Sequence, residues 1–220
     1  MLNPNIAWVI STLSALPDAD PEDRQWQTMP PEQVLPVVFW YGAHSIEPGV
    51  TQKDGDRGRY PIGELNGGRS ERAPLLSHRL EQGGLRAPRS DNIRGEIWTK
   101  FANSLCWNPV GILTLADMDG IAGSPEVVAI IEGMLNGIDA IADSFGLTMP
   151  QSIGERIDFT LSAEKHKVSM LQDLEKHHPL ELAPFEHSLA AVKNISGKAT
   201  PTIDMVLALA NLRNASYTAE

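Results

Sequence analysis

Three polar side chains recur at a spacing of four residues in an otherwise apolar stretch. Lys100, Ser104 and Asn108 would project from one side of a helix, because residues four apart are neighbours on a helix surface. An amine, a hydroxyl and an amide in one row offer several hydrogen-bond donors to a bound molecule. A solvated stripe on a surface helix shows the same pattern, and periodicity alone favours that interpretation.

A second unusual segment runs from Ser169 to Glu175 and is followed by Pro179–Leu182, which contains Glu181. Glu181 directly precedes an apolar helical pattern. A carboxylate at this position is often explained by its favourable interaction with the positive end of a helix dipole. Physical chemistry alone therefore assigns Glu181 to helix capping.

Three common kinds of catalytic or cofactor site are not supported by the sequence. The 18 glycines never form the Gly-x-Gly pair that lets a backbone approach a dinucleotide pyrophosphate. The Gly-x-Ser-x-Gly turn of many serine hydrolases does not occur. The single cysteine, Cys106, and the lack of a His-Glu-x-x-His pattern argue against a bound metal, so we expect none.

Composition and charge restrict the partners and the compartment. The net charge is −10, with 28 acidic and 18 basic residues, which argues against a nucleic-acid partner. No apolar run approaches the roughly 20 residues that a membrane helix needs, and no lysine or arginine precedes Arg24, so we expect neither a membrane segment nor a signal peptide. One cysteine fits a reducing compartment, and we expect a cytoplasmic protein.

The first 90 residues contain the strand signals. Ile6–Ile10 and Val34–Tyr41 are rich in strand-forming side chains, and Glu47–Gly49 and Asp54–Asp56 contain turn residues. We expect a short hairpin or meander there. A helix is then predicted to begin at Ser70 as its N-cap and to end at Gly83-Gly84.

From Asp91 onward the apolar pattern has a helical period and no further strand is predicted. A long helix is expected from Ile93 past Pro109, which should bend it. Further helices are expected over Pro125 to Phe145, over Ile153 to Leu161, over Leu182 to Ile195 ended by Gly197, and from Thr200-Pro201 onward.

Taken together, these segments resemble the ketopantoate reductase (2-dehydropantoate 2-reductase) family. Glu96–Lys100 followed by Asn108-Pro109 resembles the first helix of its C-terminal domain, and His166–Glu175 resembles its most recognisable block. Pro179–Leu182 and Thr200–Asp204 follow at the family's spacing, and the stretch from Pro30 to Glu64 resembles the late strands of its N-terminal domain.

The resemblance implies an α+β chain. Residues 1–90 would be a hairpin or meander plus one helix, the remnant of the nucleotide-binding domain, and the glycine-rich front half would be absent. Residues 91–220 would form the all-helical C-terminal domain, similar to that of 6-phosphogluconate dehydrogenase. The family reduces 2-dehydropantoate to pantoate with NADPH in pantothenate and coenzyme A biosynthesis. Binding of NADPH by this chain is expected to be weak or absent.

The resemblance also implies roles for single residues. Lys100 matches the lysine that acts as general acid, Asn108 and Ser169 match substrate-binding residues, and Glu181 matches a glutamate that hydrogen-bonds the substrate. Ser104 stands where the family often has a second substrate-binding asparagine. The asparagine of the family's Asn-Gly motif has no secure match.

Three functions stay open. The first is NADPH-dependent reduction of 2-dehydropantoate, with the chain inactive on its own. The second is reduction of another small 2-oxo acid. The third is a catalytically dead helical module that serves oligomerisation or interaction, and we also expect self-association through exposed strands or the helical part.

Overall fold

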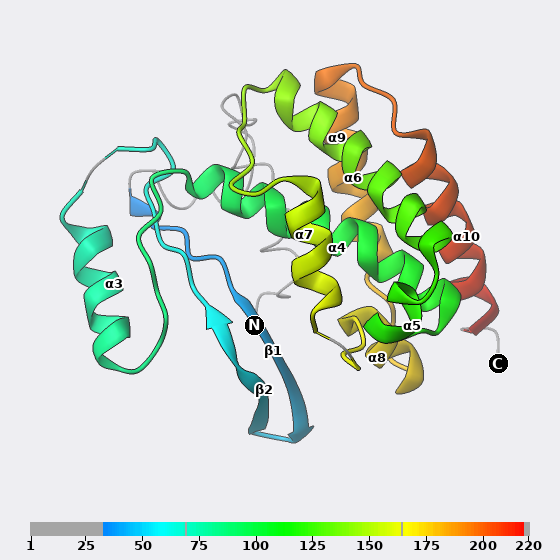
Figure 1. Cartoon of the computed structure of the whole chain (residues 1–220), viewed down its shortest axis with the longest axis horizontal. Helices are drawn as coiled ribbons and strands as arrows, with labels where there is room; N and C mark the ends of the chain where they lie inside the picture. The colour runs from blue at the N-terminus through cyan, green and yellow to red at the C-terminus, as the bar shows by residue number, and fades with distance from the viewer. Residues whose placement is uncertain (1–32, 69, 164, 218–220) are drawn as a thin grey trace.

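The computed structural model describes residues 33–68, 70–163 and 165–217. A β-hairpin and a helix come first, and a group of packed helices follows (Figure 1). The elements are β1 (Trp40–Glu47), β2 (Val50–Arg59), α3 (Arg72–Gln82), α4 (Ile93–Thr114), α5 (Met118–Ala122), α6 (Pro125–Ser144), α7 (Ile153–Leu161), α8 (Ser169–Glu175), α9 (Leu182–Ser196) and α10 (Pro201–Tyr217). The predicted α+β class is confirmed, with helices and no strand among the described residues after residue 91.

The hairpin differs in detail from the strands that the sequence predicts. The turn at Pro48-Gly49 forms as expected, and Gly49 adopts a φ of 86°, a conformation that glycine reaches without strain. The second predicted turn, Asp54–Asp56, is wrong because these residues lie inside β2. Trp40 pairs with Arg59 and Gly42 with Asp54, so β1 advances two residues while β2 advances five. The extra residues form an irregularity in β2 rather than a chain reversal.

The strand predicted over Val34–Tyr41 begins only at Trp40. Before it, Val37 forms an isolated antiparallel bridge to Ile62, and Ile62 in turn forms a parallel bridge to Arg89. The strand predicted over Ile6–Ile10 lies outside the described residues. The next helix, α3, begins at Arg72, although Ser70 Oγ does accept a hydrogen bond from Ala73 N at 3.3 Å.

Helix α4 is the central element, with α3 and the hairpin on one side and the remaining helices on the other (Figure 1). It contacts α6, α8 and α10 and buries Trp98, Phe101, Leu105 and Trp107 in the main core. The Asn92 side chain accepts a hydrogen bond from Gly95 N and so caps its start. The helix continues through Pro109 to Thr114.

Close backbone packing fixes the neighbours of α4. A Cβ at Gly95 would overlap the Thr148 carbonyl oxygen, and one at Gly111 would overlap the Cγ2 methyl of Val168. Val168 directly precedes α8. A larger residue at position 111 would therefore require the Val168 side chain to shift.

The later helices follow their predicted boundaries closely. α6 begins at Pro125, α7 spans Ile153–Leu161, and Gly146 and Gly197 adopt positive φ after α6 and α9. Two helices, α5 and α8, were not predicted, because five and seven residues are too few for a periodic signal. Within the described residues, no helix combines the length and the apolar character needed to cross a membrane.

Candidate functional site

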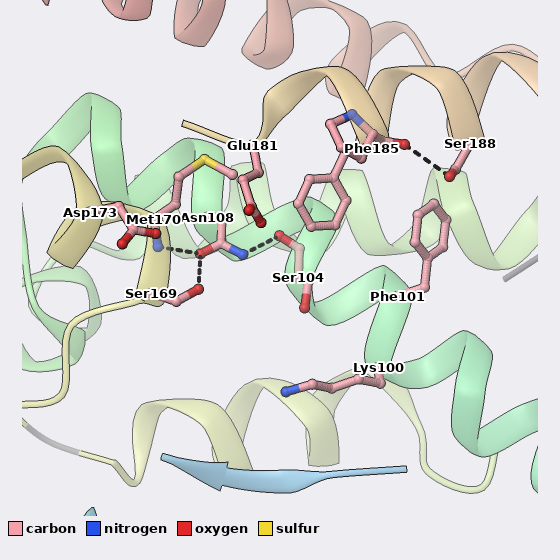
Figure 2. A pocket seen from close by; sticks show the side chains of 11 residues that line it. Lys100, Phe101, Ser104, Asn108, Ser169, Met170, Asp173, Glu181, Phe185 and Ser188 are labelled. Carbon is pink, nitrogen blue, oxygen red and sulfur yellow. Dashed lines mark hydrogen bonds between the residues drawn. The ribbon is translucent and has the colours of Figure 1, made fainter. Parts of the chain in front are cut away.

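A pocket of about 280 Å³ lies between α4, α8 and the start of α9 (Figure 2). The residues that line it are Lys100, Phe101, Ser104, Asn108, Ser169, Met170, Asp173, Glu181, Pro184, Phe185 and Ser188. All five of the residues singled out in the sequence are therefore brought to one pocket. Their roles in binding and catalysis remain predictions.

The polar row on α4 is not a solvated stripe. Asn108 is buried, and Lys100 and Ser104 are half-buried at the pocket. Burial lowers the pKa of Lys100 from 10.5 to about 8, because removal from water disfavours the charged ammonium. Lys100 therefore carries its proton at neutral pH but releases it more easily than an exposed lysine does.

Asn108 joins α4 to the start of α8. Its Oδ1 accepts hydrogen bonds from Met170 N at 3.2 Å and from Ser169 Oγ at 3.4 Å. Its Nδ2 donates to the Ser104 carbonyl oxygen at 3.0 Å, one turn earlier on α4. Figure 2 shows these hydrogen bonds, which join Ser104, Asn108, Ser169 and Met170. The amide thus positions Ser169 and satisfies a backbone N–H in the first turn of α8.

Ser169 opens α8, whereas the sequence interpretation placed no helix between Ser169 and Glu181. Because α8 was not predicted from the sequence, Asp173 was not predicted as a pocket residue either. Asp173 lies four residues after Ser169 on the same helix and lines the pocket with it. Recognition of α8 would have predicted Asp173 on the same face.

Glu181 occupies the N-cap position of α9, but its side chain makes no capping hydrogen bond. The side chain instead lines the pocket (Figure 2). Burial and then the negative charge of Asp173 raise the pKa of the Glu181 carboxyl above its ordinary value. The capping interpretation is therefore not supported, and Glu181 is available to a ligand in the pocket.

One end of the pocket is apolar, which the sequence interpretation did not anticipate. Phe101 of α4 and Phe185 of α9 stack with ring centroids 6.3 Å apart and an interplanar angle of 24°. Met170 and Pro184 add further apolar surface. Ser188, also not predicted, donates its hydroxyl to the Pro184 carbonyl oxygen at 2.9 Å. A ligand would meet polar groups near Asn108 and aromatic rings near Phe185.

The described residues contain no group of three or more His, Cys, Asp and Glu side chains arranged to hold a metal ion. Cys106 is buried in the core, and burial raises the pKa of its thiol. A thiol in this environment is a packing residue rather than a nucleophile.

The fold and the pocket together define a helical domain that presents a polar, lysine-containing cleft on its first long helix. The chain belongs to the ketopantoate reductase family: the family model described as Ketopantoate reductase PanE/ApbA C terminal matches residues 92–214.

Individual relatives agree with this assignment. The 2-dehydropantoate 2-reductase of Mesorhizobium japonicum is 35% identical over 190 residues, which are 86% of this chain and 58% of that protein. A Ralstonia solanacearum MolK2 structure assigned to the ketopantoate reductases is similar with a TM-score of 0.77 at 30% identity, over 92% of this chain and 62% of that one. A D-mandelate dehydrogenase with NADH and anilino(oxo)acetate shares the fold, with a TM-score of 0.79 at 22% identity, over 90% and 66%.

Proposed function

We propose that this chain forms the substrate-binding part of an NADPH-dependent 2-dehydropantoate 2-reductase. The observation that carries the proposal is the meeting of Lys100, Ser104, Asn108, Ser169 and Glu181 in one pocket. The chain spans about 58% of the length of the Mesorhizobium relative, so the activity of the whole protein is part of the proposal. The division into residues 1–90 and 91–220 is likewise proposed, supported by the family match that begins at residue 92.

The pocket offers groups suited to a 2-oxo acid. Reduction of its carbonyl places negative charge on oxygen, and a nearby ammonium stabilises that charge and supplies the proton. Lys100, with its pKa near 8, is protonated at neutral pH and suits this role. The hydroxyls of Ser104 and Ser169 can donate hydrogen bonds to the carboxylate end. Glu181 lines the same pocket, and its carboxylate can accept a hydrogen bond from a substrate hydroxyl.

The nicotinamide cofactor of the family does not fit the described residues by themselves. None of the 18 glycines in the sequence forms a Gly-x-Gly turn for its phosphates. We therefore assign no cofactor contact to this chain. Weak or absent NADPH binding stays a prediction, and a micromolar dissociation constant in a fluorescence titration would contradict it.

A second candidate is a reductase of a different 2-oxo acid. Ser104 provides a shorter polar group than the asparagine common in the family, and the Phe101–Phe185 stack gives the pocket an aromatic wall. Both features favour a substrate with a larger apolar group. The D-mandelate dehydrogenase of the same fold was solved with anilino(oxo)acetate, which carries an aromatic ring.

Self-association remains a prediction as well. Phe39, Tyr41, Ile46 and Val50 of the hairpin region are exposed. One structural neighbour, from Staphylococcus aureus, is a dimeric ketopantoate reductase. Light scattering on the purified chain would test this, and a strictly monomeric species at high concentration would contradict it.

A chimera tests the proposed function. The segment of the Mesorhizobium enzyme that this chain does not match is placed before this chain, and NADPH consumption is followed with a panel of 2-oxo acids. The proposal predicts turnover that is fastest with 2-dehydropantoate. Preference for an aromatic 2-oxo acid would favour the second candidate. A folded chimera that binds NADPH but reduces none of these acids would contradict both reductase functions. The catalytically inactive interaction module would then be the function that is left.

A further inference from the structure

Two cross-strand neighbours of the hairpin contact two neighbours on α4. Trp40 and Arg59 are paired across β1 and β2. Arg59 binds Glu96, and Trp40 covers Lys100, which lies one helical turn after Glu96. The hairpin is thus joined to the pocket helix at two adjacent points. In Figure 2 the Lys100 side chain lies on the side of α4 that faces the strand drawn in blue.

The Arg59–Glu96 contact sets the position of the hairpin along α4. Arg59 Nη2 lies 2.5 Å from Glu96 Oε1, and Nη1 lies 3.2 Å from Oε2. The Glu96 side chain is only 6% exposed, whereas the Arg59 side chain is 35% exposed. Two parallel hydrogen bonds to a largely buried carboxylate restrict sliding and rotation of the hairpin on the helix.

Packing then holds the Trp40 ring in place. Trp40 packs against a cluster made of Val38, Leu65, Ile93 and Ile97. Its ring meets Phe159 of α7 edge-on, with centroids 6.1 Å apart and an interplanar angle of 89°. The indole Nε1 is buried without a hydrogen-bond partner among the described residues. The ring position is therefore set by packing and ring contacts rather than by a hydrogen bond from the indole.

The Lys100 ammonium lies 4.9 Å from the centroid of this ring, within the range of a cation–π interaction. The charged groups that the structure describes around this site include Glu96 with Arg59, one turn away along α4, and Asp173 and Glu181, which line the same pocket. Trp40 differs from these groups because it presents the face of an aromatic ring to the cation.

We propose that Trp40 is a positioning residue for Lys100, held in register by the Arg59–Glu96 ion pair, and that its ring keeps the ammonium at the pocket. The inference rests on the proposed function only in that Lys100 is the proton donor. The physical claim concerns the Lys100 ammonium itself. It is therefore testable in this chain without turnover.

The test compares Trp40→Phe, which keeps an aromatic face, with Trp40→Leu and Trp40→Met, which do not. Lysines are acetylated with limiting acetic anhydride across a pH series, and the peptide that contains Lys100 is quantified by mass spectrometry. The exposed Lys198 in the same digest is the internal reference. Circular dichroism establishes which variants fold. Two non-aromatic variants are made so that the comparison is still possible if one of them does not fold.

The proposal predicts that Trp40→Phe titrates Lys100 close to the parent, near pH 8. The non-aromatic variants should titrate about half a pKa unit below Trp40→Phe, since the ring no longer favours the cation, and should label about threefold faster at neutral pH. Identical pH dependences of Lys100 acetylation in the phenylalanine and non-aromatic variants would overturn the proposal. The Trp40 ring would then fill space beside Lys100 without favouring its charged form. An inactive chimera with this pattern intact would refute the proposed function and leave the inference standing.

Discussion

Asn108 Oδ1 accepts a hydrogen bond from the backbone N–H of Met170 at 3.2 Å, and this contact joins the first long helix to the first turn of α8. Asn108 comes from the middle of α4 and Met170 from a segment more than sixty residues later. Because Ser169 adjoins Met170, the same contact places the Ser169 hydroxyl at the pocket.

Asn108→Ala should therefore cost more stability than an ordinary asparagine substitution. It leaves the Met170 N–H without its partner, and we expect a loss of about 1–3 kcal/mol in the free energy of unfolding. Asn136→Ala is the matched control, because Asn136 also donates to the carbonyl four residues earlier, at 2.9 Å, but is exposed on α6. If urea denaturation gave equal losses in the free energy of unfolding for Asn108→Ala and Asn136→Ala, the hydrogen bond from Met170 N to Asn108 would contribute nothing to stability.

Lys100→Met should stabilise the chain at neutral pH, because it removes a charge from a site that disfavours it. The folded pKa of Lys100 is about 8 and the ordinary value is 10.5. The unfolded state therefore binds more protons between these values, and the stability of the parent rises with pH across this window. The advantage of Lys100→Met should shrink as pH rises from about 8 toward 10.5. A difference in stability between Lys100→Met and the parent that stays constant across this pH range would contradict the lowered pKa.

Asp139→Asn tests a buried ion pair that joins α6 to α7. Arg156 is 3% exposed, and its Nη1 donates to Asp139 Oδ1 at 3.1 Å. Removal of one partner leaves a buried charge uncompensated, and we expect a loss of about 3–5 kcal/mol. The exposed Lys167–Glu175 pair provides the control, for which Glu175→Gln should cost about 1 kcal/mol or less. If Asp139→Asn lowered the free energy of unfolding by as little as Glu175→Gln does, burial would not strengthen the Asp139–Arg156 ion pair.

Glu181→Gln should lower kcat/KM of the chimera by roughly tenfold, the value of one hydrogen bond to a charged or polar substrate group. The raised pKa of Glu181 means that the parent changes protonation at this site closer to neutrality than an ordinary glutamate does. The glutamine variant should lose that part of the pH profile. Glu132→Gln, on the exposed face of α6, should change neither quantity. An unchanged pH profile for Glu181→Gln would contradict the proposed role of Glu181 in substrate binding.

The long helices and the site residues were predictable from sequence for different reasons. The apolar period of α4, α6 and α9 marks their buried faces, and Pro125 and Gly197 mark where helices begin and end. Periodicity alone would have assigned Lys100 and Glu181 to solvent and to capping. Their motifs resembled a family, and that resemblance singled them out.

The remaining features depend on contacts that spacing does not encode. Asp54–Asp56 has turn residues but lies within β2: Asp54 pairs with Gly42, and the two residues after it belong to the irregularity between this pair and the Trp40–Arg59 pair. α8 is too short for a periodic signal, so Asp173 was missed. Trp40 lies sixty residues before Lys100, and no local pattern relates a strand residue to a helix lysine at that distance.

The role of Lys100 as the proton donor is tested by comparing Lys100→Met with Lys198→Met in the chimera with the Mesorhizobium segment. The measured quantity is kcat for NADPH-dependent reduction of 2-dehydropantoate. If Lys100 is the proton donor, Lys100→Met should lower kcat by about 10²–10⁴-fold, the usual contribution of a general acid, with NADPH binding retained. Lys198→Met should retain the parent rate. Comparable kcat values for the two variants would show that Lys100 is not the proton donor of this pocket.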